Sequence, residues 1–158
     1  MVVVSPRVRP LLGQGVFRSL RAWSASSEIA ERRTDEYLHR VRSIVAEAIR
    51  LHDAWEEERR TREEWQAIAN AAAIYRWRLH RSLAKLARLR PPSHMLRHHH
   101  RWCRTLFAVC RAAQRLSHAY RAHHLGLLCD AANALDDAWY ALLDDLARAI
   151  SARRRRGR

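Results

Sequence analysis

Histidines and a cysteine near the middle of the chain have the residue types and spacing of metal ligands. His94 and His98 lie four residues apart, as do His99 and Cys103. Side chains with this spacing share one face of a helix, so each pair can chelate a zinc-like divalent metal. Two ligands make a weak site, and a third would have to come from elsewhere in the chain. We favour the alternative that this stretch is the solvated basic first turn of a helix, and we expect protein purified without bound metal.

Carboxylates offer a second kind of chemistry, but neither of their arrangements completes a site. Glu36 and His39 match the Glu-x-x-His motif of di-iron bundles, which also need a second such motif and further carboxylates. The acid pairs at 136–137 and 144–145 have the residue types for acid–base catalysis. Leucines alternate with them, which indicates the polar outer face of a helix. A seven-residue repeat further predicts a stripe that pairs with arginines of a neighbouring helix, namely Asp130, Asp137 and Asp144.

The chain contains none of the short motifs that identify common catalytic sites. A Gly-rich phosphate loop, Gly-x-Ser-x-Gly, Cys-x-x-Cys and His-Glu-x-x-His are all absent from the sequence. The sequence therefore gives no positive reason to propose an enzyme.

Basic residues form the third group with a chemical role, which is contact with phosphates. The formal net charge is +14, and Lys85 is the only lysine. GC-rich coding, which favours arginine codons, accounts for this as well as an anionic partner does. The predicted anion-binding residues are Arg76, Arg78, Arg81, Lys85, Arg88, Arg97, Arg101 and Arg104. The arginine run at 153–156 resembles a localisation or nucleic-acid patch. Because no base-reading motif is visible, the predicted contact with RNA, DNA or anionic lipid is independent of sequence.

The charges are unevenly distributed along the chain. Residues 28–60 carry a net charge of −2 and residues 126–152 a net charge of −4. Residues 61–90 carry +5, and residues 91–125 carry +6 with no acid. We expect two acidic and two basic helices, which in an up-down-up-down ring would give the molecule an acidic side and a basic side.

The apolar residues recur with the period of a helix in four segments. In each segment they are separated by three or four residues, which places them on one stripe of a helix. Representative stripes run from Tyr37 to Trp55, from Trp65 to Leu86, from Trp102 to Tyr120 and from Leu128 to Ala149. We therefore predict at least roughly 70% helix and no alternating strand pattern.

Proline and polar residues predict where these helices break. Pro91 and Pro92 divide the helical region into two halves, because each proline inside a helix costs roughly 3 kcal/mol. Thr61 and Glu64 fit a capping box, which predicts a turn at 59–61. No glycine or proline forces a turn there. The alternative is that one helix continues through this segment, in which case the protein would be an elongated hairpin that dimerises. Ser93 is the predicted N-cap of the third helix, and Gly126 its left-handed stop.

These elements predict an all-α fold, an antiparallel four-helix bundle made of two helical hairpins joined at Pro91-Pro92, with flexible basic termini. Residues 1–26 form a basic, disordered or targeting lead-in, residues 27–152 the bundle, and residues 153–158 an Arg-rich tail. The lead-in lacks acids and is amphipathic over 11–23, as in a mitochondrial transit peptide or an interfacial anchor. An ordinary basic extension is the alternative.

The cysteines and the lengths of the apolar runs limit the cellular locations that we expect for this protein. Cys103 and Cys110 lie seven residues apart on a helix, too far to form a disulfide with each other. The odd number of three cysteines favours a reducing, intracellular and cytoplasmic location, or a mitochondrial one if the lead-in is a targeting sequence. No run reaches the about 18 apolar residues of a transmembrane helix, so we expect a soluble or peripheral protein.

Three functional hypotheses follow from the sequence. The first is a non-enzymatic helical-bundle interaction or accessory protein with a basic face for an anionic partner, and with a protein partner or a second copy as a further possibility. The second is a His/Cys metal-binding bundle. The third is an organelle-targeted subunit of an RNA-containing assembly.

Overall fold

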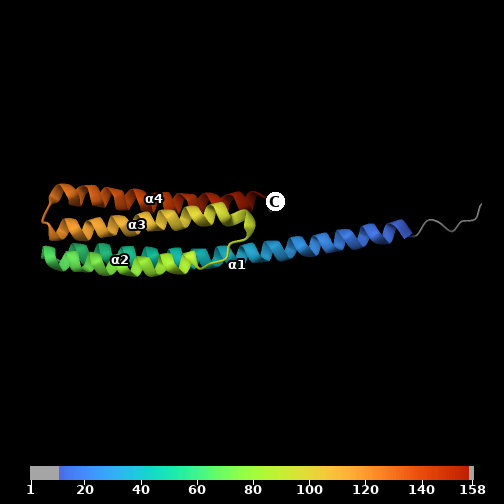
Figure 1. Ribbon diagram of the computed structural model, residues 1–158, viewed down its shortest axis with the longest axis horizontal. Helices are drawn as coiled ribbons and strands as arrows, with labels where there is room; N and C mark the ends of the chain where they lie inside the picture. Colours follow the sequence, from blue (N-terminus) through green and yellow to red (C-terminus); the bar gives the residue numbers. More distant parts are fainter. Residues whose placement is uncertain (1–10, 157–158) are drawn as a thin grey trace, which may run out of the picture. The chain divides into compact units, whose positions relative to one another are not determined.

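A computed structural model describes the backbone of residues 11–156 and the side chains of residues 26–153 and of Arg155. Over the described residues the chain is 91% helical and contains no strand, which confirms the predicted all-α fold. The elements are α1 (Leu11–Thr61), α2 (Trp65–Ala87), the 3-10 turn η1 (Ser93–Met95), α3 (Leu96–Arg121) and α4 (Leu125–Arg156) (Figure 1). Among these helices, none is long and apolar enough to cross a membrane.

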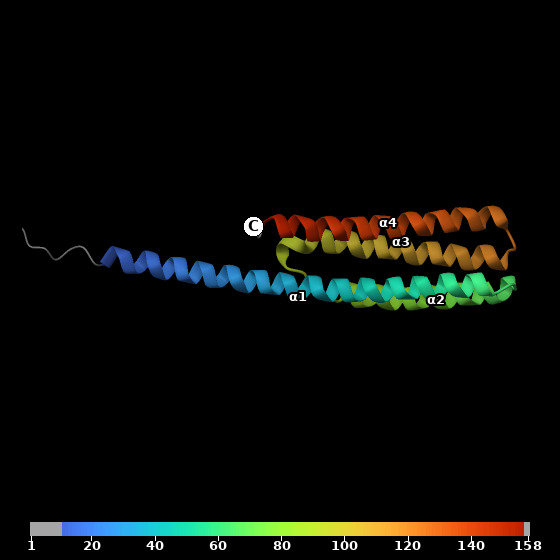
Figure 2. The same cartoon turned by 180° about the vertical axis from the view of Figure 1, so that it is seen from behind.

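The chain divides into two compact units, residues 1–36 and residues 37–158. The second unit is the four-helix bundle, and side-chain contacts between its helices give their order. The ring of His52 on α1 lies near the rings of both Tyr75 on α2 and Trp139 on α4. Ser117 on α3 donates a hydrogen bond to the carbonyl of Ala69 on α2. The helices therefore form a ring in chain order, and each is antiparallel to the next (Figure 2).

The break at the proline pair is confirmed. Helix α2 ends at Ala87, and the backbone NH of Met95 donates to the carbonyl of Pro92 at 2.8 Å to begin η1. Ser93 is the first residue of this 3-10 turn rather than the N-cap of α3, so its predicted role is wrong. The proline φ angle suits the residue just before a turn, which places the cap at Pro92.

A turn separates the first two helices, but it lies at 62–64 rather than at the predicted 59–61, and the predicted capping box does not form. Helix α1 continues to Thr61, and residues 62–64 link it to α2. The Thr61 hydroxyl donates to the carbonyls of Glu57 and Glu58, at 3.1 and 3.2 Å, in its own helix. Glu64 is the N-cap residue of α2 and makes no side-chain capping bond. A threonine hydroxyl in the last turn of a helix can bond to carbonyls three and four residues earlier, and here this bond replaces the predicted cap.

The predicted role of Gly126 is also wrong, because a histidine ends α3 in the left-handed conformation. His123 has φ 51°, and its NH donates to the carbonyl of Tyr120. The NH of His124 donates to the carbonyl of Ala119, which completes a Schellman motif. The His123 ring stacks on Trp65 with 5.0 Å between ring centroids. Gly126 lies instead in the first turn of α4.

The termini are more helical than the sequence predicted. Helix α1 begins at Leu11, inside the predicted lead-in, and α4 extends to Arg156, inside the predicted tail. The rest of these two segments, and the side chains of residues 11–25, lie outside the described residues.

The core of the bundle consists largely of leucines and aromatic residues packed against alanines. Leu79, Leu106 and Leu142 are completely buried, and Trp102 is 1% exposed. Small residues lie on all four helices of this core, including Ala48, Ala72, Ala113 and Ala131. Large side chains facing small ones allow neighbouring helices to pack closely without voids.

Replacing each of two buried serines by alanine should change the stability of the bundle in opposite directions. The Ser117 hydroxyl donates to the Ala69 carbonyl at 3.0 Å, whereas the Ser82 hydroxyl has no partner among the described residues. Ser117→Ala should destabilise the bundle by about 1 kcal/mol through the lost bond. Ser82→Ala should stabilise it by about 1 kcal/mol, because it removes an unpaired hydroxyl and raises helix propensity. Urea unfolding measures both signs, and destabilisation by both would contradict the expectation.

Candidate functional site

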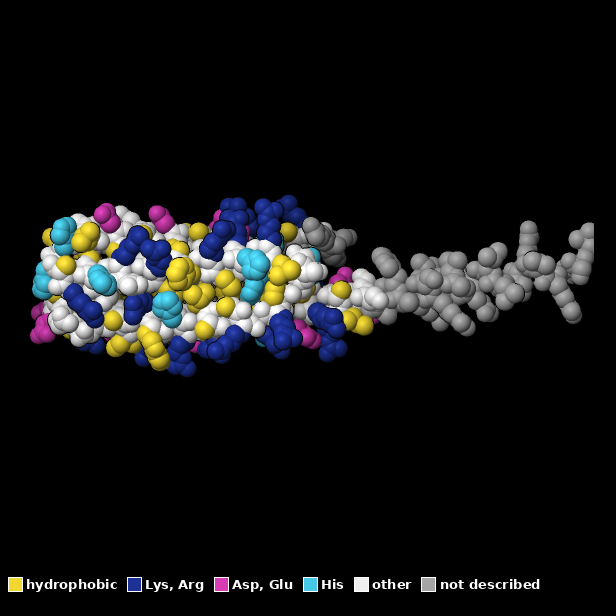
Figure 3. Space-filling model, viewed as in Figure 1, with side chains coloured by type: hydrophobic (Ala, Val, Ile, Leu, Met, Phe, Trp, Pro, Cys, Tyr) yellow, Lys and Arg dark blue, Asp and Glu magenta, His cyan; other side chains and the backbone are white. Residues whose placement is uncertain are grey.

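The predicted anion-binding residues fall on two flanks of the bundle. Lys85 of α2 pairs with Glu47 of α1 at 2.7 Å, and Arg101 of α3 pairs with Asp145 of α4 at 3.2 Å. Lys85 therefore faces the acidic helix α1, whereas Arg101 faces α4. In Figure 3 basic side chains lie along the lower edge over α2 and across the upper half over α3 and α4, with hydrophobic side chains and histidines between them.

The α2 residues of the predicted set differ in their surroundings. Arg78 and Arg88 are exposed, and the Arg81 guanidinium lies 5.0 Å from the ring centre of Trp77. Arg76 is half-buried, and its Nε has no hydrogen-bond partner among the described residues. The acidic helix α1 adjoins this flank and neutralises Lys85, so the α2 arginines do not stand on a surface free of acids.

Helix α3 carries a longer basic stripe than the sequence analysis identified. Arg97, Arg101, Arg104, Arg111 and Arg115 are all exposed, and their spacings of 4, 3, 7 and 4 residues keep them on one face. Helix α3 contains no Asp or Glu. Apart from Arg101, none of these arginines forms an ion pair with a described carboxylate. Arg111 and Arg115 were missed, although their spacing continues that of the first three.

We call these five residues the α3 arginine stripe. Its second half borders an open groove beside α4. The groove has a volume of about 660 Å³. It is lined by residues of α3 and of the first turns of α4: Arg111, Gln114, Arg115, His118, Ala119, Ala122, Leu127, Asp130 and Ala131. The groove is therefore lined by cationic, amide and apolar side chains, and Asp130 is the only acid among its lining residues.

The acid that pairs with this stripe is not one of those predicted. Asp144, a member of the predicted stripe, pairs with Arg148 on its own helix. Asp145 pairs with Arg101 and is only 5% exposed, and its Oδ2 has no hydrogen-bond partner in the described structure. One residue along a helix rotates the side chain by about 100°, which is enough to exchange solvent for the neighbouring helix.

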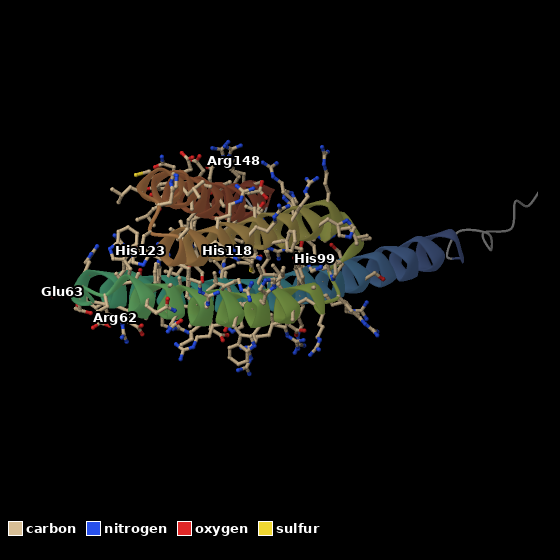
Figure 4. All side chains as sticks on the ribbon, turned by 60° about the vertical axis from the view of Figure 1, so that its left-hand side comes forward. Arg62, Glu63, His99, His118, His123 and Arg148 are labelled. Atoms are coloured by element: carbon tan, nitrogen blue, oxygen red, sulfur yellow. The ribbon has the colours of Figure 1, made fainter. Side chains whose placement is uncertain are left out.

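The predicted metal ligands come together only in part. His99 is buried, its Nδ1 lies 2.9 Å from the Tyr37 hydroxyl, and its Nε2 lies 3.7 Å from the Cys103 sulfur (Figure 4). Burial lowers the pKa of His99 and raises the pKa of Cys103. His98 packs instead on Trp102, and His94 is exposed. Among the described residues, no three His, Cys, Asp or Glu side chains gather in a metal-binding arrangement.

The Glu-x-x-His residues on α1 have solvent-exposed positions. Glu36 and His39 are both exposed, and Glu36 forms an ion pair with Arg32 one turn earlier at 3.2 Å. Both side chains therefore face solvent rather than an inward-facing metal site.

A hydrogen-bonded chain at the centre of the bundle joins three helices. The Tyr75 hydroxyl accepts from Trp139 Nε1 at 3.1 Å and lies 3.0 Å from His52 Nδ1. An indole NH only donates, so the Tyr75 oxygen accepts that bond and its own proton is free to donate to His52. Burial raises the pKa of Tyr75 well above its ordinary value, so the hydroxyl stays protonated.

The half-buried His52 and the buried His99 predict a dependence of stability on pH. Burial lowers the pKa of His52, and this effect exceeds the increase caused by the nearby carboxylates Glu56, Asp53 and Asp136. Burial also lowers the pKa of His99. Below the unfolded value of about 6.5 the unfolded imidazoles bind protons that the folded ones do not. The free energy of unfolding should therefore fall as pH drops from about 6.5 through the folded pKa values.

Urea unfolding between about pH 7.5 and pH 5.5 measures this loss, in the range where histidines titrate. The double variant His52→Gln, His99→Gln should show a flatter profile than the parent chain. The exposed pair His39→Gln, His80→Gln is the matched control and should keep the parent slope. Equal flattening by both pairs would contradict the assignment.

Comparison with known protein families, with curated proteins and with solved structures finds no match for this chain.

Proposed function

We propose that this protein is a helical-bundle interaction protein that binds the phosphate backbone of nucleic acid, independently of sequence, through the α3 arginine stripe. The observation that carries the proposal is a row of four exposed arginines that form no ion pair with a described carboxylate, on a helix that contains no acid: Arg97, Arg104, Arg111 and Arg115. A guanidinium has a fork of donors that fits two phosphate oxygens at once.

The dimensions of the stripe suit a polymer rather than a single small anion. Arg97 and Arg115 are 18 residues apart, which corresponds to about 27 Å along the helix axis. Duplex nucleic acid carries one charge per about 1.7 Å of its axis, so the four unpaired arginines can meet phosphates along one binding site. The groove beside Arg111 and Arg115 offers Gln114 and His118 as further hydrogen-bonding groups.

Salt dependence of binding tests the proposal. Four arginine contacts should give a slope of about −3.6 for log K against log salt on duplex of random sequence. The triple variant Arg104→Gln, Arg111→Gln, Arg115→Gln should reduce the magnitude of that slope by about 2.7. Fluorescence anisotropy with labelled random duplex RNA and DNA, measured between low and physiological salt, gives both values.

A matched control separates position from total charge. The triple variant Arg78→Gln, Arg81→Gln, Arg88→Gln on α2 removes the same charge and should leave the slope near that of the parent. A third variant that lacks residues 153–158 measures the contribution of the tail. If the two triple variants reduce the slope equally, or if deletion of the tail alone abolishes binding, the α3 stripe is not the binding surface. If the parent chain binds no nucleic acid at low salt, the proposal is wrong.

A further inference from the structure

A second cavity lies on the other side of α4 from the arginine stripe, between α4, α1 and α3. It has a volume of about 430 Å³, within the range of small-molecule sites. Trp55 of α1 and Tyr120 of α3 line it, and both side chains are buried. Leu116, Leu128 and Leu135 supply apolar walls. Aromatic and aliphatic surface of this kind accepts the hydrocarbon part of a small organic molecule.

The polar groups of this cavity favour a cation. Glu56 and Arg59 both line it and neutralise each other through an ion pair of 2.7 Å. Asp136 faces them from α4, is exposed, and forms no ion pair with a described cation. The lining therefore carries one carboxylate charge that is not balanced, although the whole chain has a net charge of +14. A carboxylate next to aromatic rings is the environment that binds organic ammonium ions.

His52 supplies a directional group on the same wall. It lines the cavity, and its Nδ1 is occupied by the Tyr75 hydroxyl. The bond to Tyr75, which also accepts from Trp139, leaves Nε2 at the other edge of the ring. This orientation is fixed from inside the core, so the cavity has one group that is already positioned before a ligand binds.

We propose that this cavity binds a small arylalkylammonium ion, with its ammonium group at Asp136 and its ring against Trp55 and Tyr120. The site shares no residue with the α3 arginine stripe and binds the opposite charge. Tests of ammonium binding at this cavity therefore do not depend on whether the protein binds nucleic acid.

Three probes of similar shape test the proposal on the full chain. Phenethylammonium, 2-phenylethanol and phenylacetate differ mainly in charge, and isothermal titration compares their affinities. We expect phenethylammonium to bind with Kd on the order of 1 mM, the alcohol more weakly and the carboxylate not measurably. Because the protein has a net charge of +14, non-specific attraction would favour phenylacetate, so preference for the cation is diagnostic.

Substitutions in and beside the cavity test whether phenethylammonium binds there. Asp136→Asn should weaken phenethylammonium at least about tenfold. Asp137→Asn, the same change at the next exposed residue, does not touch the cavity and should have no effect. Ala132→Leu fills the cavity and should abolish binding while circular dichroism shows that the helices are intact. In a Cys103→Ser background, alkylation of the exposed Cys129 at the cavity wall should be slowed by phenethylammonium but not by phenylacetate.

The proposal is overturned by any of three results: phenylacetate binding as well as phenethylammonium, equal losses in Asp136→Asn and Asp137→Asn, or no saturable binding of the ammonium ion to the folded parent chain.

Discussion

Replacing Trp102 by alanine should destabilise the bundle by about 3–5 kcal/mol. Its side chain is 1% exposed, and its ring stacks on Tyr37 with 6.4 Å between centroids and an interplanar angle of 18°. The variant loses the transfer free energy of the indole and leaves a cavity that neighbouring helices fill only in part. A domain of this size has a total stability of about 5–15 kcal/mol, so the variant should unfold at much lower urea concentration.

Trp77 provides the control for that substitution. It lies on α2, is 57% exposed, and its ring lies beside the Arg81 guanidinium. Trp77→Ala should change the free energy of unfolding by less than about 1 kcal/mol. Comparable losses in the two variants would mean that Trp102 is not in the core.

Tyr75→Phe should destabilise the bundle by about 2–3 kcal/mol although it removes only one oxygen atom. The hydroxyl accepts from Trp139 Nε1 and bonds to His52 Nδ1, and Trp139 is 5% exposed. Without the hydroxyl, a buried NH and an imidazole nitrogen lose their partner, and each bears the cost of desolvation. Chemical unfolding followed by circular dichroism measures the loss.

Two further variants attribute that loss to the hydrogen bonds. Tyr140 is 73% exposed, and Tyr140→Phe should leave stability unchanged within about 0.5 kcal/mol. Trp139→Phe removes the donor, so a double-mutant cycle with Tyr75→Phe should give a coupling of about 1 kcal/mol. Additive effects in the cycle would contradict a direct bond between the two side chains.

The sequence predicted the helices well because their apolar residues repeat with the period of a helix. The stripe from Trp102 to Tyr120 is buried as expected. The proline pair marked the break between the hairpins for an equally local reason, since no helix continues through two prolines. These features depend on one segment at a time, so the residues of that segment contain the information.

The ends of helices were predicted less well, because several residues compete for one role. A glycine at the end of α3 was expected to adopt the left-handed conformation, but His123 adopts it and stacks on Trp65, a residue 58 positions earlier. A distant aromatic ring thus offsets the local cost of a left-handed histidine. Propensity alone does not contain this contact.

The candidate sites depend even more on packing between helices. The sequence identified arginines on α2 and α3, but the ring order of the helices decides that Lys85 meets Glu47 and Arg101 meets Asp145. Arg111 and Arg115 were within reach of sequence reasoning, since they continue the spacing of Arg97 and Arg104. The cavity at Trp55 and Asp136 was not, because its walls come from three helices.

The short links of the bundle have a consequence for how quickly it forms. Residues 62–64 join α1 to α2, and residues 122–124 join α3 to α4. Closing such short loops costs little chain entropy, so each hairpin is a unit that can assemble from local contacts. The remaining step brings two preformed hairpins together about the Pro91-Pro92 link, where Tyr75 on one hairpin finds Trp139 on the other. Contacts between the hairpins, rather than the helices themselves, therefore set the slow step of folding.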